Sequence, residues 1–306
     1  MTQAVLSQSR LSVYEAVTQK IVAAIEEGVG TYKTPWHTGG SAIMLPTNAA
    51  THAEYRGINV VALWAEAISR NYANGLWASY KQWQSLGAQV RQGERGALIV
   101  FYKRAELTPA ESADEAATEL RFFARASWVF NVAQVDGYAP ILPEARNEVE
   151  RIAEAEAFVN ATEARIAHGY GMACYRRKLD LIEMPHAECF IGSGTSSPTE
   201  AYYATLLHEL THWSGAEHRL NREFGKRYGD DRYAMEELVA ELGAAFMCAA
   251  FGIALEPRPD HAAYVASWIK VLGRDNRAIF TAASKAQDAF EHLAYLATRN
   301  ETPSDT

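Results

Sequence analysis

The pentapeptide His208-Glu209-Leu210-Thr211-His212 follows an apolar run, residues 202–207, that contains neither Gly nor Pro. Such a run predicts a helix that continues through the pentapeptide. Residues i and i+4 share one face of a helix, so both imidazoles point the same way and can bind one metal ion. Glu209 lies one residue along, where it can act as the general base on a water at that metal. This is the HExxH arrangement, in which two His bind zinc and the Glu takes a proton.

A zinc site of this kind needs a third protein ligand, and a second acidic helix is predicted at residues 233–246. An apolar stripe along this helix predicts that one of its sides is buried. Glu237 and Glu241 lie four residues apart near that stripe, and a carboxylate close to a core needs a partner. The spacing resembles the gluzincin pattern, in which the first acid binds the metal and the second holds a ligand His. It favours Glu237 as the third ligand and Glu241 as the residue that holds His208 or His212.

Alternatives for the third ligand remain at this point. Glu241 or Glu236 can take the place of Glu237. His218 is another candidate, because Gly215 and His218 stand where the HExxHxxGxxH pattern of metzincins has its Gly and its third His. Metzincins also have a Met-turn beneath the metal, and Met235 lies too near the acidic helix to serve in one. The plain structural alternative is a salt-bridged helix that holds no metal.

Composition bounds the class of protein. The chain has 306 residues and an apolar share of 48%, which is enough for one large domain or two ordinary ones. Its three cysteines show no CxxC spacing, so reduced thiols of a cytoplasmic protein are expected. No secretory signal is visible at the start, and Glu241 interrupts the longest apolar stretch, residues 238–255. No membrane partner is therefore expected.

The first part of the chain is expected to form a small α+β domain. Helical spacing of apolar residues predicts helices at 11–27 and 58–70 and a short helix at 79–83 that stops at Gly87. Strands are predicted at 97–102 and 122–131, with a flexible polar excursion, residues 106–119, between them. Two prolines and a change of composition at 138–143 mark a linker. The predicted domains are therefore residues 1–138 and residues 139–306.

The second domain is expected to be mainly helical, so the whole chain is assigned to the α+β class. Helices are predicted at 144–168, around the two metal-binding motifs, and at 264–273 and 276–296. The extended run 179–184 is the candidate for a strand edge that binds an extended substrate chain. Of the 29 basic and 37 acidic side chains, 12 of each lie in residues 1–138, so residues 139–306 carry the whole net charge of −8. That half is expected to repel a polyanion.

Aromatic and basic residues alternate in the first domain, from Trp36 to Arg104. Aromatic faces stack on unpaired bases while basic groups hold the backbone, which is how single-stranded nucleic acid is bound. The competing interpretation places the aromatics in the core, as we expect for Trp64 and Trp83. The predicted stacking residues are Tyr55, Trp77 and Tyr80, and the predicted backbone contacts are Lys81, Arg91, Lys103 and Arg104.

Several motifs resemble one family. Residues 55–59, 77–82, 87–96 and 129–134 look like the N-terminal domain of ArdC-type antirestriction proteins, and residues 200–213 and 236–242 look like their second domain. The resemblance implies a single-stranded-DNA-binding domain joined to a zincin-like metallopeptidase domain. It also implies a protein of plasmids and other mobile elements that protects DNA entering by conjugation from host restriction. Arg56 and Asn59, within the first motif, join the predicted nucleic-acid contacts.

The favoured hypothesis is therefore an antirestriction protein that binds single-stranded DNA and carries a zinc HExxH site. One zinc ion is expected, although another divalent metal also fits these ligands. The alternative is a cytosolic zinc metallopeptidase that acts on a protein substrate and uses DNA only for recruitment. The Glu at position 209 favours a hydrolytic site.

Overall fold

The computed structural model describes residues 12–28, 36, 44–105, 121–140, 147–225, 231–255 and 261–299. The predicted excursion 106–119 and both chain ends lie outside these residues. The first half contains α1 (Val13–Gly28), α2 (Ile58–Ser69), α3 (Tyr80–Ser85), β1 (Thr47–Asn48), β2 (Leu76–Ala78), β3 (Gln89–Val90), β4 (Ala97–Ala105), β5 (Arg121–Asn131) and β6 (Val135–Asp136). The second contains α4 (Glu148–Ala161), β7 (Ile166–His168), β8 (Cys174–Arg176), β9 (Leu181–Met184), α5 (Pro198–Ser214), α6 (Asp231–Phe251), α7 (His261–Arg274) and α8 (Ala278–Arg299).

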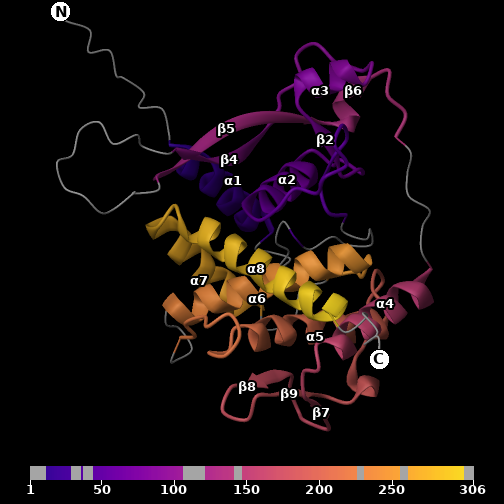
Figure 1. Cartoon of the computed structure of the whole chain (residues 1–306), viewed down its shortest axis with the longest axis vertical. Coiled ribbons are helices and arrows are strands. Elements are labelled where there is room, and N and C mark those ends of the chain that lie inside the picture. Colours follow the sequence, from indigo (N-terminus) through magenta and orange to yellow (C-terminus); the bar gives the residue numbers. More distant parts are fainter. Residues whose placement is uncertain are drawn as a thin grey trace, which may run out of the picture.

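A four-stranded sheet in the order β1-β2-β5-β4 forms the outer layer of the first half. Its long antiparallel hairpin β4–β5 lies at the top of Figure 1, above α1 and α2. Asn59 of α2 joins helix and hairpin, because its side chain donates to the carbonyl of Val100 and accepts from the amide of Val100, at 2.9 and 2.7 Å. The predicted helices and strands of this half are confirmed, and the strands β1, β2, β3 and β6 were not predicted.

The second half is built mainly from helices that stack below the first (Figure 1). Helix α6 lies among α5, α7 and α8 and is buried on nearly every side from Ala234 to Ala249. Helices α5 and α6 approach so closely that a Cβ added at Gly243 would lie 2.6 Å from Cγ2 of Thr211. This close contact sets the distance between the helix that carries the HExxH motif and the helix that carries the acidic motif.

One hydrophobic core runs through both halves. It contains Val17, Ile21 and Ile25 of α1 together with Trp268 of α7 and Phe280 of α8. At the surface, Arg56 forms an ion pair with Glu291 of α8 and the amide of Gly57 donates to Gln287 at 3.0 Å. A boundary between residues 138 and 139 remains a prediction, and the shared core shows that the two segments pack as one body.

The small sheet at the bottom of Figure 1 has the strand order β7-β9-β8. Strand β9 is the middle strand and pairs on both sides, so the prediction that residues 179–184 form a free edge is wrong. The edges are β7 and β8. The helix predicted at 144–168 is also too long: α4 ends at Ala161, and Glu163 has a left-handed backbone with φ of 57°. Within the described residues, no helix has both the length and the apolar character needed to cross a membrane.

Candidate metal centre

Helix α5 begins at a strong start signal. Ser197 caps it by accepting from the amide of Glu200 at 3.1 Å, while the Glu200 carboxylate accepts from the amide of Ser197 at 3.0 Å. Pro198 occupies the first turn, where its missing N–H costs nothing. From Leu206 onward the helix is buried, and this buried end carries His208, Glu209 and His212. The sequence thus fixes the helix at its exposed end and buries the HExxH motif at the other.

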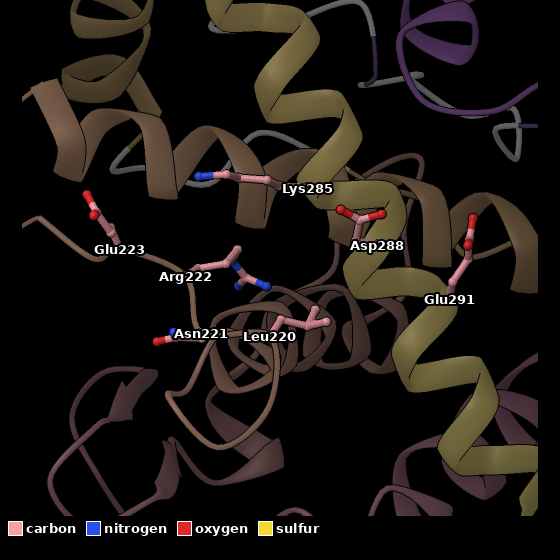
Figure 2. A pocket seen from close by; sticks show the side chains of 7 residues that line it. All are labelled: Leu220, Asn221, Arg222, Glu223, Lys285, Asp288 and Glu291. Atoms are coloured by element: carbon pink, nitrogen blue, oxygen red, sulfur yellow. The ribbon is translucent and has the colours of Figure 1, made fainter. Parts of the chain in front are cut away.

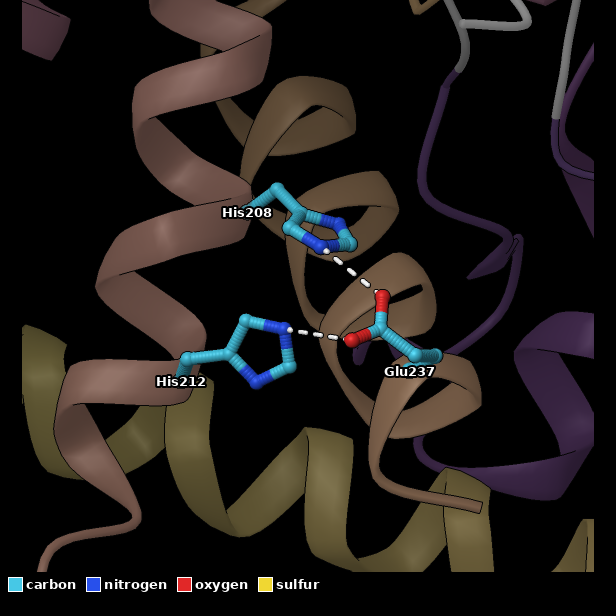
Figure 3. Close-up of side chains that lie close together, drawn as sticks. All are labelled: His208, His212 and Glu237. Atoms are coloured by element: carbon cyan, nitrogen blue, oxygen red, sulfur yellow. Dashed lines mark ion pairs between the residues drawn. The ribbon is translucent and has the colours of Figure 1, made fainter. Parts of the chain in front are cut away.

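Three buried side chains converge between α5 and α6 (Figure 3). Nε2 of His208 lies 3.6 Å from Oε2 of Glu237, and Nε2 of His212 lies 3.5 Å from Oε1 of the same carboxylate. All three ligand atoms lie within 4.8 Å of one another. Ligand atoms about 2.0–2.2 Å from one tetrahedral ion are roughly 3.3–3.6 Å apart. The cluster therefore fits a single divalent ion in both donor type and spacing.

The outward-facing nitrogens of both rings also meet carboxylates of α6. Nδ1 of His208 lies 3.5 Å from Oε2 of Glu241, and Nδ1 of His212 lies 3.2 Å from Oε1 of Glu236. A carboxylate at one ring nitrogen fixes the ring and leaves the other nitrogen for a metal. Glu241 was predicted to hold one of the two rings, and it lies at His208. The role of Glu236 at His212 was not predicted.

Glu236 is itself held by a buried cation. The Arg222 guanidinium donates to both Glu236 oxygens, at 2.9 Å from Nη2 and 3.1 Å from Nε, and also to Ser214 at 2.8 Å. Arg222 and Glu236 are both buried, so each charge compensates the other. The only hint of this pair in the sequence is that Glu236 and Glu237 are adjacent, so one of them must point away from the face that carries the other.

The electric field in the cluster favours positive charge. Burial lowers the pKa of His212, but the carboxylates of Glu237 and Glu236 outweigh it and raise this pKa to about 10. Burial raises the pKa of Glu237, and the two imidazoles outweigh it and hold this pKa well below its ordinary value. Without a metal, therefore, the buried carboxylates stabilise a proton on His212. The same carboxylates would stabilise a metal cation bound in the cluster.

Glu209 is buried beside the cluster and faces the small sheet. Its Oε2 accepts from the amide of Tyr175 in edge strand β8 at 2.8 Å. This bond orients the carboxylate of the residue that directly follows His208 in the helix. His218, the alternative third ligand, lies elsewhere: its side chain is 63% exposed and its Nε2 lies 3.4 Å from Asp180. The structure therefore does not support His218 as a ligand.

The predicted nucleic-acid contacts divide into three groups. Trp77 is only 1% exposed and belongs to the core below the sheet, so its stacking role is corrected: no base can reach its face. Both the oxygen and the nitrogen of the Asn59 side-chain amide are hydrogen-bonded to the backbone of Val100. The Arg56 guanidinium forms an ion pair with Glu291. The half-buried Tyr55 accepts a hydrogen bond at its hydroxyl from Asn48 at 3.2 Å. Trp77, Asn59 and Tyr55 therefore hold the fold, whereas Arg56 is 64% exposed and a ligand would have to compete with its ion pair.

The remaining candidates lie at the surface or outside the described side chains. Tyr80 is 42% exposed, and Lys81 beside it is exposed. Arg91 is exposed but forms ion pairs with Glu94 and Asp136. Lys103 and Arg104 lie on β4, and their side chains are outside the described set. Tyr80 and Lys81 are thus the predicted pair that remains available to a ligand.

An aromatic surface that was not predicted lies on β5. Trp128 is 58% exposed, and the half-buried Phe130, which also packs on the small core around Trp83, follows it on the same face of the strand. Gly96 lies between them: a Cβ there would be 3.2 Å from Cβ of Trp128 and 3.3 Å from the Phe130 ring. Tyr80 meets Phe130 edge-on, with ring centroids 6.5 Å apart. Alternation along β5, with buried Val129 between two aromatics, was the signal that could have found this surface.

A cavity of about 550 Å³ lies between the segment after α5 and helix α8 (Figure 2). None of the three converging side chains lines it, so it is separate from the candidate metal centre. Its side chains carry both charges, and Arg222 reaches from its wall to Glu236. The lining residues are Leu220, Asn221, Arg222, Glu223, Lys285, Asp288 and Glu291.

Comparisons with known proteins agree with this architecture. Residues 11–130 match the model of the N-terminal domain of anti-restriction factor ArdC, and residues 153–285 match that of a zincin-like metallopeptidase. The chain is 49% identical over 288 residues to the uncharacterized protein y4eC of Sinorhizobium fredii, covering 92% of this chain and 91% of that one. It is 33% identical over 297 residues to the DNA primase TraC of Escherichia coli, and it covers only 20% of that protein.

Two solved structures match over nearly the whole chain. The metal-free antirestriction ArdC protein from plasmid R388 superposes with a TM-score of 0.74 at 35% identity, covering 94% of this chain and 99% of that one. The Mn(II)-bound form superposes with a TM-score of 0.72, covering 94% and 98%. The similarity therefore extends through both halves and includes a relative that binds a divalent metal.

Proposed function

Because the chain belongs to the family of ArdC-type antirestriction proteins, we propose that it protects the DNA of a mobile element by binding single strands and that it carries a zinc HExxH site. The buried convergence of His208, His212 and Glu237, in a chain that matches ArdC through both halves, is the observation that supports this function. The proposal has a metal part and a nucleic-acid part, which rest on different residues.

In the metal part, His208, His212 and Glu237 hold one zinc ion, while Glu241 and Glu236 hold the two rings. Two imidazoles and one carboxylate are a common zinc donor set that leaves one position open. When bound, the ion would polarise a carbonyl and a water molecule. The Tyr175 amide orients the Glu209 carboxylate, which would serve as the proton acceptor of the site. A carboxylate beside each Nδ1 favours the ring orientation in which Nε2 points at Glu237 and is the nitrogen offered to the ion.

In the nucleic-acid part, unpaired bases stack on Trp128, Phe130 and Tyr80. The three rings follow one another along β5 and the start of α3, with Gly96 leaving the strand surface flat between the first two. Exposed Lys81 and Arg95 adjoin Tyr80 and Gly96 in the chain and supply positive charge for the backbone. Only single strands expose base faces, so stacking favours them over duplex.

A second candidate function is a zinc metallopeptidase that acts on a protein substrate and uses DNA for recruitment. The position of Glu209 favours it, since a purely structural metal site has no use for a carboxylate oriented beside the ligands. Edge strand β8, whose Tyr175 amide meets Glu209, is then the element beside which an extended chain would lie. The two functions differ in whether protection requires Glu209.

The test of the proposed function uses the full chain with Trp128→Ala. Loss of one stacked base costs about 1–3 kcal/mol, so the affinity for a labelled oligonucleotide should fall roughly 5- to 150-fold. Tyr295→Ala is the control, because Tyr295 is an equally exposed aromatic on α8. The binding constant should also fall as salt rises. Its logarithm should decrease by about 0.7 for each phosphate neutralised per tenfold increase in salt concentration. Equal affinity for duplex and single strand, or an equal loss in both variants, would contradict the proposed surface.

A further inference from the structure

Trp36 brings the first half of the chain to the metal centre. Its side chain is fully buried, and its Nε1 donates to Oε1 of Glu241, 205 residues away in the sequence, at 3.3 Å. Its ring packs against Trp268 of α7, with centroids 6.2 Å apart. The indole thus reaches the middle of the helical layer, where it contacts a carboxylate of α6.

The same carboxylate faces a candidate metal ligand. Oε1 of Glu241 accepts from Trp36, and Oε2 lies 3.5 Å from Nδ1 of His208. Nε2 of that ring points at Glu237. An indole N–H can only donate, so it can hold Glu241 only as an acceptor. A continuous series of contacts therefore runs from Trp36 through Glu241 and His208 to the centre of the cluster.

The two candidate His ligands are supported in different ways. The carboxylate behind His212 is Glu236, which is held by Arg222 from the same half of the chain. The carboxylate behind His208 is held by an indole from the other half. A change at residue 36 should therefore affect the orientation of His208 and leave the support of His212 in place.

We propose that Trp36 is a positioning residue of the metal centre: by holding Glu241 it fixes the His208 ring, so that the first half of the chain completes the site built by the second. This inference rests on the proposed zinc site. It differs from a packing role in one respect, because it requires the indole N–H and not merely the volume of the ring.

The experiment is a zinc titration against a competing chelator with the full chain carrying Trp36→Phe. The substitution keeps an aromatic ring and removes the N–H. Loss of a partner of a ligand His weakens metal binding about 10- to 100-fold, and we expect roughly 10-fold because Trp36 is one residue further from the ion. Trp268→Phe is the matched control: Trp268 is equally buried, packs on Trp36, and donates to the carbonyl of Ala234 at 3.0 Å instead of to a carboxylate.

Both variants lose one buried indole bond, so their metal-free melting temperatures should fall by similar amounts. Their zinc affinities should differ. If Trp36 acts through Glu241, the double variant Trp36→Phe/Glu241→Ala binds zinc as tightly as Glu241→Ala alone, because Glu241→Ala has already removed the acceptor of the indole N–H and the two losses are not additive.

Three outcomes would overturn the role of Trp36: wild-type affinity in Trp36→Phe, an equal loss in Trp268→Phe, or additive losses in the double variant. Failure of the wild-type protein to bind stoichiometric zinc is a distinct result, since it would remove the metal site itself.

Discussion

At the scale of single residues, each of the two imidazoles has a carboxylate at Nδ1 and the shared Glu237 at Nε2. This pairing fixes the orientation of each ring before any ion arrives, because a ring flip would place a carbon atom against a buried carboxylate. It also assigns different tasks to three neighbouring acids of α6. Glu237 faces the Nε2 atoms of both rings. Glu236 lies at Nδ1 of His212, and Glu241 lies at Nδ1 of His208.

This assignment predicts different effects for two substitutions on the same helix. Glu237→Ala removes a ligand and should abolish stoichiometric zinc, as should His208→Ala. Glu241→Ala removes only the support of His208 and should weaken zinc binding about 10- to 100-fold. The measurement is zinc content after gel filtration, followed by a chelator competition. His218→Ala is the control and should bind as the wild type does; zinc loss in that variant, with retention in Glu237→Ala, would reverse the ligand assignment.

The sequence predicts much of this cluster because helical spacing places residues on faces. It predicts a shared face for His208 and His212, and it singles out Glu237 and Glu241 of α6. It names Glu236 only as an alternative third ligand. It does not predict the contact of Glu236 with His212 or that of Trp36 with Glu241, since both depend on how α6 meets elements distant in the sequence. Trp77 fails for a related reason: its neighbours Tyr80 and Lys81 are exposed, and only the pairing of β2 with β5 shows that Trp77 itself points inward.

At the scale of elements, the distance between α5 and α6 depends on the absence of one side chain. Thr211 lies against Gly243, and the Thr211 hydroxyl donates to the carbonyl of Leu207 at 2.9 Å, which keeps it from rotating away. His212 and Glu237 lie on these same two helices. A change in helix spacing therefore changes the separation of the proposed ligands.

Gly243→Ala tests this dependence. Alanine favours a helix by about 1 kcal/mol over glycine, but overpacking a buried contact costs about 1–3 kcal/mol. We expect a net loss of stability of up to about 2 kcal/mol in urea unfolding, together with weaker zinc binding. Gly273→Ala in α7 is the control, because a Cβ there meets nothing within 4 Å and the helix should gain about 0.5–1 kcal/mol. A stabilised Gly243→Ala with unchanged zinc affinity would contradict this view of the helix pair.

Long elements were predictable and most short ones were not. The helices α1 and α2 and the hairpin strands β4 and β5 follow from periodicity over many residues, and the six-residue α3 is an exception among the short elements. Strands β1, β3 and β6 have two residues each, too few for any period to appear. Helix α4 was predicted to run on to residue 168 because no Gly or Pro interrupts the segment around 162–165. The helix ends instead where Glu163 adopts a left-handed backbone conformation, which the amino-acid composition does not predict.

At the scale of the whole molecule, the two halves share a core but differ in charge. Residues 1–138 are neutral and residues 139–306 carry the net charge of −8, so the second half should not add to DNA binding. In Figure 1, β5 lies at the top and β8 at the bottom, with the layers of helices between them. The proposed stacking surface and the carboxylate of Glu209 are therefore at opposite ends of one body, which allows each to be changed alone.

Glu209→Gln keeps the volume of the side chain, and its amide oxygen can still accept from the Tyr175 amide. It removes the ability to take a proton, so any hydrolytic activity should be lost while zinc and single-stranded-DNA affinities stay as in the wild type. The measurement is the protection of unmodified DNA from a restricting host after conjugation. We expect protection to survive in Glu209→Gln and to be lost in Trp128→Ala, because covering the DNA is enough to block an enzyme that must reach it. Loss of protection in Glu209→Gln at unchanged DNA affinity would favour the metallopeptidase function instead. A large fall in its DNA affinity would contradict the separation of the two ends.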